Sequence, residues 1–203
     1  MKKILPADPQ GIEEAARAIL DGKVVAFPTE TFYGLGAEAF HRDAVQKIFA
    51  IKGREEKNPL LVLIAERDWL PQLVKNIPPS AEALMDRFWP GPLTLIFEAS
   101  SSIPPQVTAG TGKIGIRLSS HPIAQALVQK VGRAVTGTSA NRSGRPSTQT
   151  AEEVWEALGD CVDAILDGGK TKGGLGSTVL DITSDPPRIV REGAIPRSFL
   201  AGT

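Results

Sequence analysis

Residues 114–137 read "IGIRLSSHPIAQALVQKVGRAVTG", and they decide the fold class. The opening IGIRLS is mostly apolar and predicts a strand. The following PIAQALVQKVG places its apolar residues at helical spacing and ends on a glycine, which favours a helix that stops there. The closing RAVTG predicts a second, short strand. A strand, a helix and a strand in succession are the repeating unit of an α/β fold.

The same alternation extends in both directions along the 203 residues. Further helices are predicted at residues 9–21, 42–53, 79–89 and 150–159. Further strands are predicted at residues 23–27, 59–65, 93–99, 162–169, 177–183 and 188–193, with a loop at 28–40. The last three strands have no helix between them, so part of the sheet is expected to be antiparallel. With no repeat or linker, we expect one domain over residues 1–203, a core from about 10 to 196, and no second C-terminal domain.

Composition favours a soluble globular protein. Apolar residues make up 41% of the chain and charged residues 23%. No apolar run is long enough to span a membrane, and the first residues lack the apolar segment of a secretory signal. The single cysteine, Cys161, excludes an internal disulfide and a cysteine-rich zinc site, and we expect it to be buried. A cytoplasmic location without membrane contact is the resulting expectation.

Charge is balanced overall, with 23 basic and 23 acidic residues, but it is unevenly distributed. Residues 99–151 contain no Asp or Glu. The cations in this acid-free block are Lys113, Arg117, Lys130, Arg133, Arg142 and Arg145. Such a block can attract anions, although six cations over that length are also compatible with an ordinary surface.

Inside the acid-free block, residues 134–148 read "AVTGTSANRSGRPST". The stretch follows a predicted strand and precedes a predicted helix, where α/β proteins commonly bind ligands. Its hydroxyls, amide and arginines suit phosphate or carboxylate oxygens. A solvated surface loop would have a similar composition, so composition alone leaves both interpretations open.

Two further polar segments and one arginine in an apolar strand also carry groups that suit the binding of anions. Residues 27–36, "FPTETFYGLG", leave a strand and present hydroxyl groups, and residues 52–59, "KGREEKNP", carry three cations at a helix end. Arg117 stands inside an apolar strand, so it needs either an internal acid or a bound anion. Because its own region has no acid, we expect the anion.

Two glycine patterns are rejected as nucleotide-binding loops. Gly110, Gly112 and Gly115 have dinucleotide-loop spacing but precede a strand instead of following one. The GGKT at residues 168–171 lacks the first glycine and the helix of a phosphate-binding loop.

Seven segments occur in a fixed order: PTETFYGLG, KGREEKNPLLVLI, WPGPLTLI, IGIRL, TSANRSG, GSTVLDI and IVREGAI. Together they resemble the YrdC-domain family, in particular its short, TsaC-type threonylcarbamoyl-AMP synthases, over about residues 24–195. The resemblance implies a single-domain twisted mixed sheet flanked by helices, with a concave, positively charged cleft. It also implies synthesis of threonylcarbamoyl-adenylate and pyrophosphate from L-threonine, bicarbonate and ATP, with Mg²⁺ accompanying ATP and no protein-ligated metal. The product would go to the tRNA threonylcarbamoyl-transferase machinery.

The resemblance also assigns residues. Catalytic roles fall on Lys52, Arg54, Ser139 and Asn141. Threonine binding falls on Thr31, Arg117 and Ser177, and ATP binding on Arg54, Asn58, Ser139, Ser147 and Arg191. Two positions depart from the family pattern. Leu63 stands where longer relatives have a threonine-contacting histidine, and Lys113 stands where a hydroxyl is usual.

Other functions compatible with the sequence are an RNA-binding module, with weak RNA binding in the acid-free block, and an inactive paralogue of the same fold. Low aromatic content, 5%, and zero net charge argue against RNA as the main ligand. A carbamoyl-phosphate-using relative of the hydrogenase-maturation protein would carry further parts that this sequence lacks.

Overall fold

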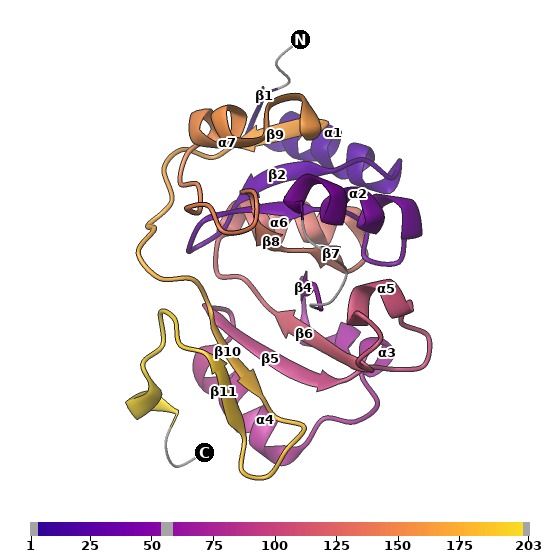
Figure 1. The fold of residues 1–203 in the computed structure, drawn as a ribbon, viewed down its shortest axis with the longest axis vertical. Coiled ribbons are helices and arrows are strands. Elements are labelled where there is room, and N and C mark those ends of the chain that lie inside the picture. Colours follow the sequence, from indigo (N-terminus) through magenta and orange to yellow (C-terminus); the bar gives the residue numbers. More distant parts are fainter. Residues whose placement is uncertain (1–3, 54–58, 201–203) are drawn as a thin grey trace.

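The computed structural model describes residues 4–53 and 59–200, in which the strands form two mixed sheets. Figure 1 shows one sheet in the half that holds the N-terminus and the other in the half that holds the C-terminus. The first has the spatial order β1 (Ile4–Pro6), β9 (Ala164–Asp167), β2 (Val25–Pro28), β3 (Tyr33–Gly36) and β8 (Thr138–Ser139). The second has the order β11 (Arg188–Arg191), β10 (Thr178–Asp181), β5 (Leu93–Glu98), β6 (Lys113–Arg117), β4 (Leu61–Leu63) and β7 (Val135–Thr136).

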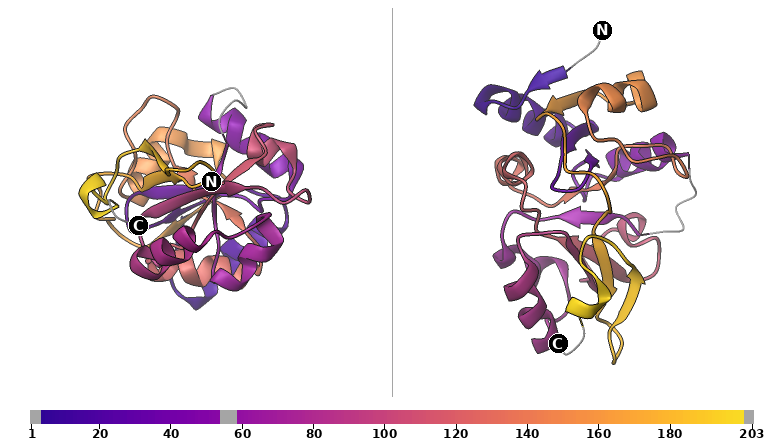
Figure 2. Two further views of the ribbon diagram at one scale, coloured as in Figure 1. Left: turned by 90° about the horizontal axis from the view of Figure 1, so that it is seen from below. Right: turned by 90° about the vertical axis from the view of Figure 1, so that its left-hand side faces the viewer.

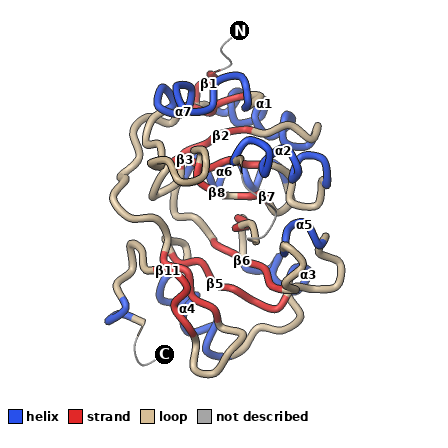
Figure 3. The backbone as a smooth tube through the Cα atoms, viewed as in Figure 1, coloured by secondary structure: helices blue, strands red, loops and turns tan. Residues whose placement is uncertain are grey.

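Helices flank both sheets (Figure 3). The α-helices are α1 (Pro9–Leu20), α2 (Arg42–Lys52), α3 (Leu70–Leu73), α4 (Pro79–Phe88), α5 (Pro105–Thr108), α6 (Pro122–Val131) and α7 (Ala151–Leu158). Short 3₁₀ turns are η1 (Arg67–Trp69), η2 (Gly159–Cys161) and η3 (Arg197–Phe199). Figure 2 shows the same two halves from two other directions.

Helix ends follow local sequence signals. Asp8 caps α1, with its carboxylate accepting a hydrogen bond from the Gly11 amide at 2.8 Å, and Pro9 occupies the first helical position. Gly53 ends α2 with a left-handed φ of 61°. Thr150 caps α7 by accepting from the Glu153 amide at 3.2 Å. These predicted helices therefore form where the sequence indicates.

The core consists of two apolar clusters. One includes Leu35, Ile48 and Leu95, and it joins α2 to both sheets. The other packs α1 and α6 onto the first sheet through residues such as Ile19 and Leu127. Burying such side chains contributes about 1.5–3 kcal/mol each, so these clusters hold the two sheets in place.

The sheets are joined where the polar stretch of residues 134–148 begins. β7 pairs antiparallel with β4 of the second sheet, and β8, one residue later, pairs antiparallel with β3 of the first. Gly137 lies between the two short strands, and a Cβ there would come within 2.8 Å of the Leu63 side chain. Glycine at this position therefore lets the chain cross closely from one sheet to the other.

The structure confirms a mixed α/β fold and corrects several details. The strands divide into two sheets because β9 runs parallel to β1 and β2, whereas β10 pairs parallel with β5. The expected antiparallel pair is β10 with β11. The loop expected at residues 28–40 contains β3, since the polar turn at residues 29–32 folds the chain back onto β2. Cys161 is exposed, not buried.

None of the helices in residues 4–53 and 59–200 is long and apolar enough to cross a membrane.

Candidate functional site

A cavity of about 1130 Å³ lies between the two sheets. Its walls come from the β2–β3 turn and β8 on one side and from β5, β6, β10 and β11 on the other. The predicted site residues that line it are Thr31, Lys52, Arg117, Ser139, Asn141, Ser147, Ser177 and Arg191. Arg54 and Asn58 lie outside the described residues. The fold thus brings residues up to 160 positions apart in the sequence to one cavity.

Lys52, at the end of α2, is fixed to the chain after β8. It is only 4% exposed, and its Nζ donates to the Ser139 carbonyl at 2.6 Å and to Asn141 Oδ1 at 2.7 Å. Ser139 Oγ lies 3.2 Å from the same ammonium group and donates to Asn141 Oδ1 at 2.7 Å. Three predicted catalytic residues therefore form one hydrogen-bonded cluster with a buried positive charge at its centre.

The polar stretch of residues 134–148 is held by hydrogen bonds to backbone carbonyls, both within the stretch and at the end of α2. Asn141 Nδ2 donates to the Arg145 carbonyl, and the Ser143 amide donates to the Lys52 carbonyl at 2.9 Å. Thr148, which is buried, donates through Oγ1 to the Ala140 carbonyl at 3.0 Å. Residues 142–146 are exposed, whereas Thr138, Ser139, Asn141 and Ser147 line the cavity. The stretch is therefore partly a surface loop and partly a wall of the cavity.

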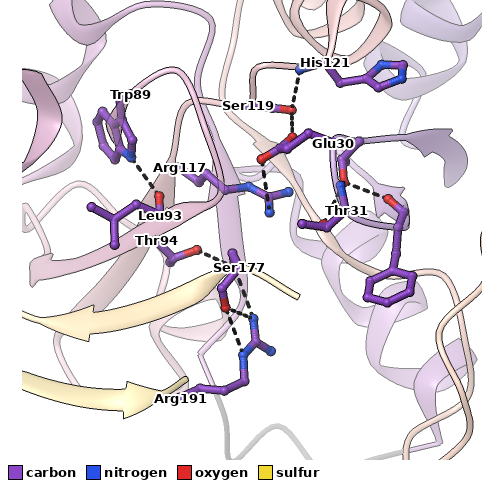
Figure 4. Close-up of polar contacts among 12 residues, drawn as sticks. Glu30, Thr31, Trp89, Leu93, Thr94, Arg117, Ser119, His121, Ser177 and Arg191 are labelled. Carbon is purple, nitrogen blue, oxygen red and sulfur yellow. Dashed lines mark hydrogen bonds and ion pairs between the residues drawn. The ribbon is translucent and has the colours of Figure 1, made fainter. Parts of the chain in front are cut away.

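Arg117 is paired with an acid that the sequence analysis did not assign to it. Its guanidinium Nη1 lies 3.7 Å from Oε1 of Glu30, which belongs to the β2–β3 turn (Figure 4). Both side chains are less than a tenth exposed. Burial lowers the pKa of Arg117, whereas the charge of Glu30 opposes that shift. Of the two partners considered for Arg117, an internal acid is present, because the turn brings Glu30 across from the other sheet. Binding of an anion by Arg117 stays a prediction.

Ser177 and Arg191 form a second polar group on the opposite wall. Arg191 donates to the Ser177 carbonyl through Nε at 3.2 Å and through Nη2 at 2.9 Å, and Nη2 also reaches Ser177 Oγ at 3.1 Å (Figure 4). Ser177 Oγ lies 2.9 Å from Thr94 Oγ1. These bonds fix the hydroxyl and the guanidinium at the start of β10 and the end of β11.

Thr31 is positioned by the turn that carries Glu30. Thr29 Oγ1 donates to the Phe32 carbonyl at 2.7 Å and lies 3.1 Å from Thr31 Oγ1. The Gly173 amide donates to the Thr31 carbonyl at 2.8 Å, which ties the turn to the long segment between β9 and β10. Both threonines are buried, so their hydroxyls are held in defined positions beside the cavity.

The two departures from the family pattern have different surroundings. Leu63 is fully buried in the apolar cluster beneath α1 and α6, and it is not among the residues that line the cavity. Lys113 does line the cavity, and its Nζ lies 2.9 Å from Asp181 Oδ2. Burial acts to raise the pKa of Asp181, but hydrogen bonds from Thr183 and Lys113 outweigh it and hold the pKa below its usual value.

The cavity lining carries charges of both signs. The charged lining residues are Lys52, Lys113, Arg117, Arg188, Arg191, Asp181 and Glu192. Only two cations of the acid-free block line the cavity, and Lys130 instead contacts Glu13 at 2.5 Å. The positive character of the cleft therefore stays a prediction. The described part of the chain contains no group of three or more His, Cys, Asp or Glu side chains that could hold a metal ion.

Sequence reasoning missed Glu30, Ser119 and Asp181 as neighbours of site residues. A partial signal for Glu30 was present, since a buried arginine in an acid-free block needs either an acid from another segment or a bound anion. Which segment supplies that acid depends on the pairing of β2 with β3, which no local pattern specifies.

The structure is thus an α/β fold of two mixed sheets with a polar cavity between them, in which the buried Lys52 holds Ser139 and Asn141. The Sua5/YciO/YrdC family model, described as "Telomere recombination", matches residues 17–193. The chain belongs to this family.

Relatives of known name agree with that assignment. The chain is 45% identical over 185 residues to a threonylcarbamoyl-AMP synthase of Pyrococcus abyssi, with 91% of this chain and 54% of that protein covered. It is 46% identical over 191 residues to a threonylcarbamoyl-AMP synthase of Bacillus subtilis, with 94% and 55% covered. The chain thus spans about half the length of these relatives.

A solved structure gives the same match in three dimensions. The crystal structure of Pyrococcus abyssi Sua5 complexed with L-threonine superposes with a TM-score of 0.94 at 41% sequence identity. The match covers 100% of this chain and 61% of that one. The fold of this chain is therefore shared with a protein that has been crystallised with L-threonine.

Proposed function

We propose that this protein is a threonylcarbamoyl-AMP synthase, which converts L-threonine, bicarbonate and ATP into threonylcarbamoyl-adenylate and pyrophosphate. The product would serve a transferase that modifies tRNA next to the anticodon. The observation that carries the proposal is the convergence of Lys52, Ser139 and Asn141 with Arg117 and Ser177 on one cavity. The names of the two relatives and of the threonine complex support the same reaction.

The chemistry needs a place for several anions. Condensation of the threonine amine with bicarbonate gives a carbamate and releases water. A carbamate oxygen then attacks the α-phosphorus of ATP, and the bond to pyrophosphate breaks. Such phosphoryl-group chemistry depends mainly on positioning and on stabilisation of negative charge. The cations that line the cavity suit these tasks.

The first group of residues would act on the nucleotide. Ser139 and Asn141 would contact phosphate oxygens with the Ser147 hydroxyl nearby, and Lys52 would hold both residues in place while lowering the local negative charge. Because the Lys52 ammonium already donates at 2.6 and 2.7 Å to the chain, fixing the wall is as much its task as contacting a phosphate. Arg54, Asn58 and Arg191 complete the proposed ATP contacts.

The second group would bind the amino acid. Arg117 would pair with the threonine carboxylate, and the Thr31 and Ser177 hydroxyls would lie on either side. Mg²⁺ would enter as part of the MgATP substrate, bound mainly by phosphate oxygens, as is common for nucleotide enzymes. Direct binding of RNA by the acid-free block stays a prediction.

Pyrophosphate release from ATP tests the proposal. The purified chain is assayed with L-threonine and bicarbonate together and with each omitted in turn. We expect release that requires both and forms threonylcarbamoyl-adenylate, which mass spectrometry detects. Release that ignores threonine, or no release in the complete mixture, would reject this function.

A further inference from the structure

The ion pair between Glu30 and Arg117 connects the two sheets beside the cavity. Glu30 lies in the turn between β2 and β3 of the first sheet, and Arg117 is the last residue of β6 in the second. Figure 4 shows the two side chains pointing toward each other from these two elements. A carboxylate carried by the first sheet therefore contacts an arginine of the second sheet.

The contact pairs the charge of Arg117 with that of Glu30 but does not occupy the N–H donors of the guanidinium. The Nη1–Oε1 distance of 3.7 Å is longer than a hydrogen bond. Glu30 Oε1 and Arg117 Nε are both buried and have no hydrogen-bond partner among the described residues. An arginine that is held in this way keeps donors for another acceptor, which a substrate carboxylate can supply.

Glu30 is itself held by the segment that follows Arg117. The Ser119 hydroxyl donates to Glu30 Oε2, and the same hydroxyl oxygen accepts from the His121 amide at 3.2 Å. Ser119 is two residues beyond Arg117, so the carboxylate is anchored to the strand end that carries the arginine. Arg117 and Ser119, at one end of β6, therefore both contact the Glu30 carboxylate.

Glu30 does not line the cavity, although its neighbours Thr29 and Thr31 do. Glu30 would therefore affect the binding of a ligand in the cavity through the position of Arg117 and not by direct contact. We propose that Glu30 is a positioning residue that holds the Arg117 guanidinium at the cavity wall, ready for the carboxylate of the amino-acid substrate. This inference rests on the function proposed above.

The first test is Glu30→Gln, which keeps the shape of the side chain but removes its charge. We expect the KM for L-threonine to rise about tenfold, as the loss of one well-placed ionic contact implies, with the KM for ATP changed less than about twofold. Glu98→Gln is the matched control, because Glu98 forms an ion pair with Lys75 that is about half exposed. That control is expected to leave both KM values unchanged.

A double-mutant cycle separates positioning from general support of the fold. Arg117→Ala alone is expected to raise the threonine KM by at least about tenfold. If Glu30 acts through Arg117, adding Glu30→Gln to Arg117→Ala raises the threonine KM by less than about twofold further. Additive effects in the cycle would overturn the inference.

The outcomes remain separable if a variant is unstable. Where thermal unfolding shows that Glu30→Gln does not fold, Glu30→Asp takes its place, since it keeps the charge but shortens the reach. A severalfold rise of the threonine KM in this variant supports the inference, and an unchanged value overturns it. Failure of the unsubstituted protein to release pyrophosphate rejects the proposed function itself. If that protein is active and substitution of Glu30 leaves the threonine KM unchanged, only the positioning role is rejected.

Discussion

At the level of single residues, Lys52 is a nearly buried cation of the candidate site. A nearly buried ammonium group must keep its hydrogen bonds, because an unpaired buried charge costs several kcal/mol. Its bonds to the Ser139 carbonyl and to Asn141 Oδ1 tie the end of α2 to the cavity wall. The lysine therefore links the stability of the wall to the chemistry proposed there.

We predict that Lys52→Met lowers pyrophosphate release at least about 100-fold, which is the scale seen when one group that stabilises a transition state is removed. Lys47→Met is the matched control on the same helix. Lys47 donates to the Gly22 carbonyl at 3.1 Å, and it does not line the cavity. Steady-state kinetics of both variants provide the measurement. Equal losses in the two variants would show that the effect is not specific to the site.

Tyr33 permits a direct test of the structure, because it is the single tyrosine of the chain. Its hydroxyl donates to the Gly169 carbonyl at 2.8 Å and accepts from the Gly168 amide at 3.2 Å. Burial raises the pKa of Tyr33 to about 12. We expect the phenolate absorbance to appear near that pH in the folded protein and near pH 10, the ordinary value, in denaturant.

The Tyr33 shift also has a consequence for stability. Below pH 10 the phenol is protonated in both the folded and the unfolded state, so its contribution to the free energy of unfolding is constant. Between pH 10 and about 12 the unfolded chain loses the proton first, and stability falls as pH rises. Tyr33→Phe should remove this part of the pH dependence. A phenolate signal near pH 10 in the folded protein would contradict the burial of this side chain.

At the element scale, local signals explain why the helices begin and end where they do. Asp8 accepts from the Gly11 amide, and the chain then enters α1 through Pro9. The helix packs on the first sheet through Ala15, Ala16 and Ile19, which are buried. Capping and the apolar face together account for this element.

Asp8→Ala is predicted to lower the free energy of unfolding by about 1 kcal/mol, because one amide of the first turn loses its partner. Asp8→Asn should lose much less, since the amide oxygen can still accept the bond. Chemical denaturation of the three proteins measures the difference. Because α1 lies outside the cavity lining, the threonine KM should stay unchanged.

Strands were less completely determined by local patterns. The apolar runs predicted β2, β4, β5, β6 and β10 well, because each is mostly buried. The segment YGLG, which forms β3, has two glycines and follows a polar turn, so its local sequence favours a loop. It becomes a strand because β2 and β8 pair with it on both sides. Tertiary pairing thus overrides a weak local preference.

At the scale of the whole molecule, the cavity belongs to both sheets. Ser139 lies at the edge of the first sheet, and Arg117 and Ser177 lie in or beside strands of the second. Figure 1 shows the segment between β9 and β10 running along one side of the molecule from one sheet to the other. A ligand that fills the cavity would therefore contact both halves at once.

Binding should consequently stabilise the whole fold. We predict that ATP together with L-threonine raises the unfolding temperature more than the larger of the two single-ligand effects. At a ligand concentration of about 100 Kd, one site contributes about 2.7 kcal/mol to the free energy of unfolding. Calorimetric scans at fixed protein concentration measure this, with D-threonine as the control ligand. A null effect of both ligands would contradict a shared cavity for them.

The candidate site was predictable from sequence only in part. The polar stretch at residues 134–148 and the cations at the end of α2 were identified as candidates, and their order along the chain indicated the family. Glu30 and Asp181 were not assigned as partners, because each meets its cation across a sheet or between sheets. The roles proposed for Arg54 and Asn58 stay predictions, as these two residues lie outside the described ranges.

Helices α1, α2, α4, α6 and α7, most of the buried strands and the family were predictable from the sequence, because they depend on periodicity, caps and the order of motifs. Only the tertiary structure decided that the strands form two sheets, that β7 and β8 cross between them, and that Glu30 faces Arg117. The physical reason is that strand pairing and ion pairing across a cavity join residues far apart in the chain. Their energies depend on which surfaces meet, and no single segment contains that information.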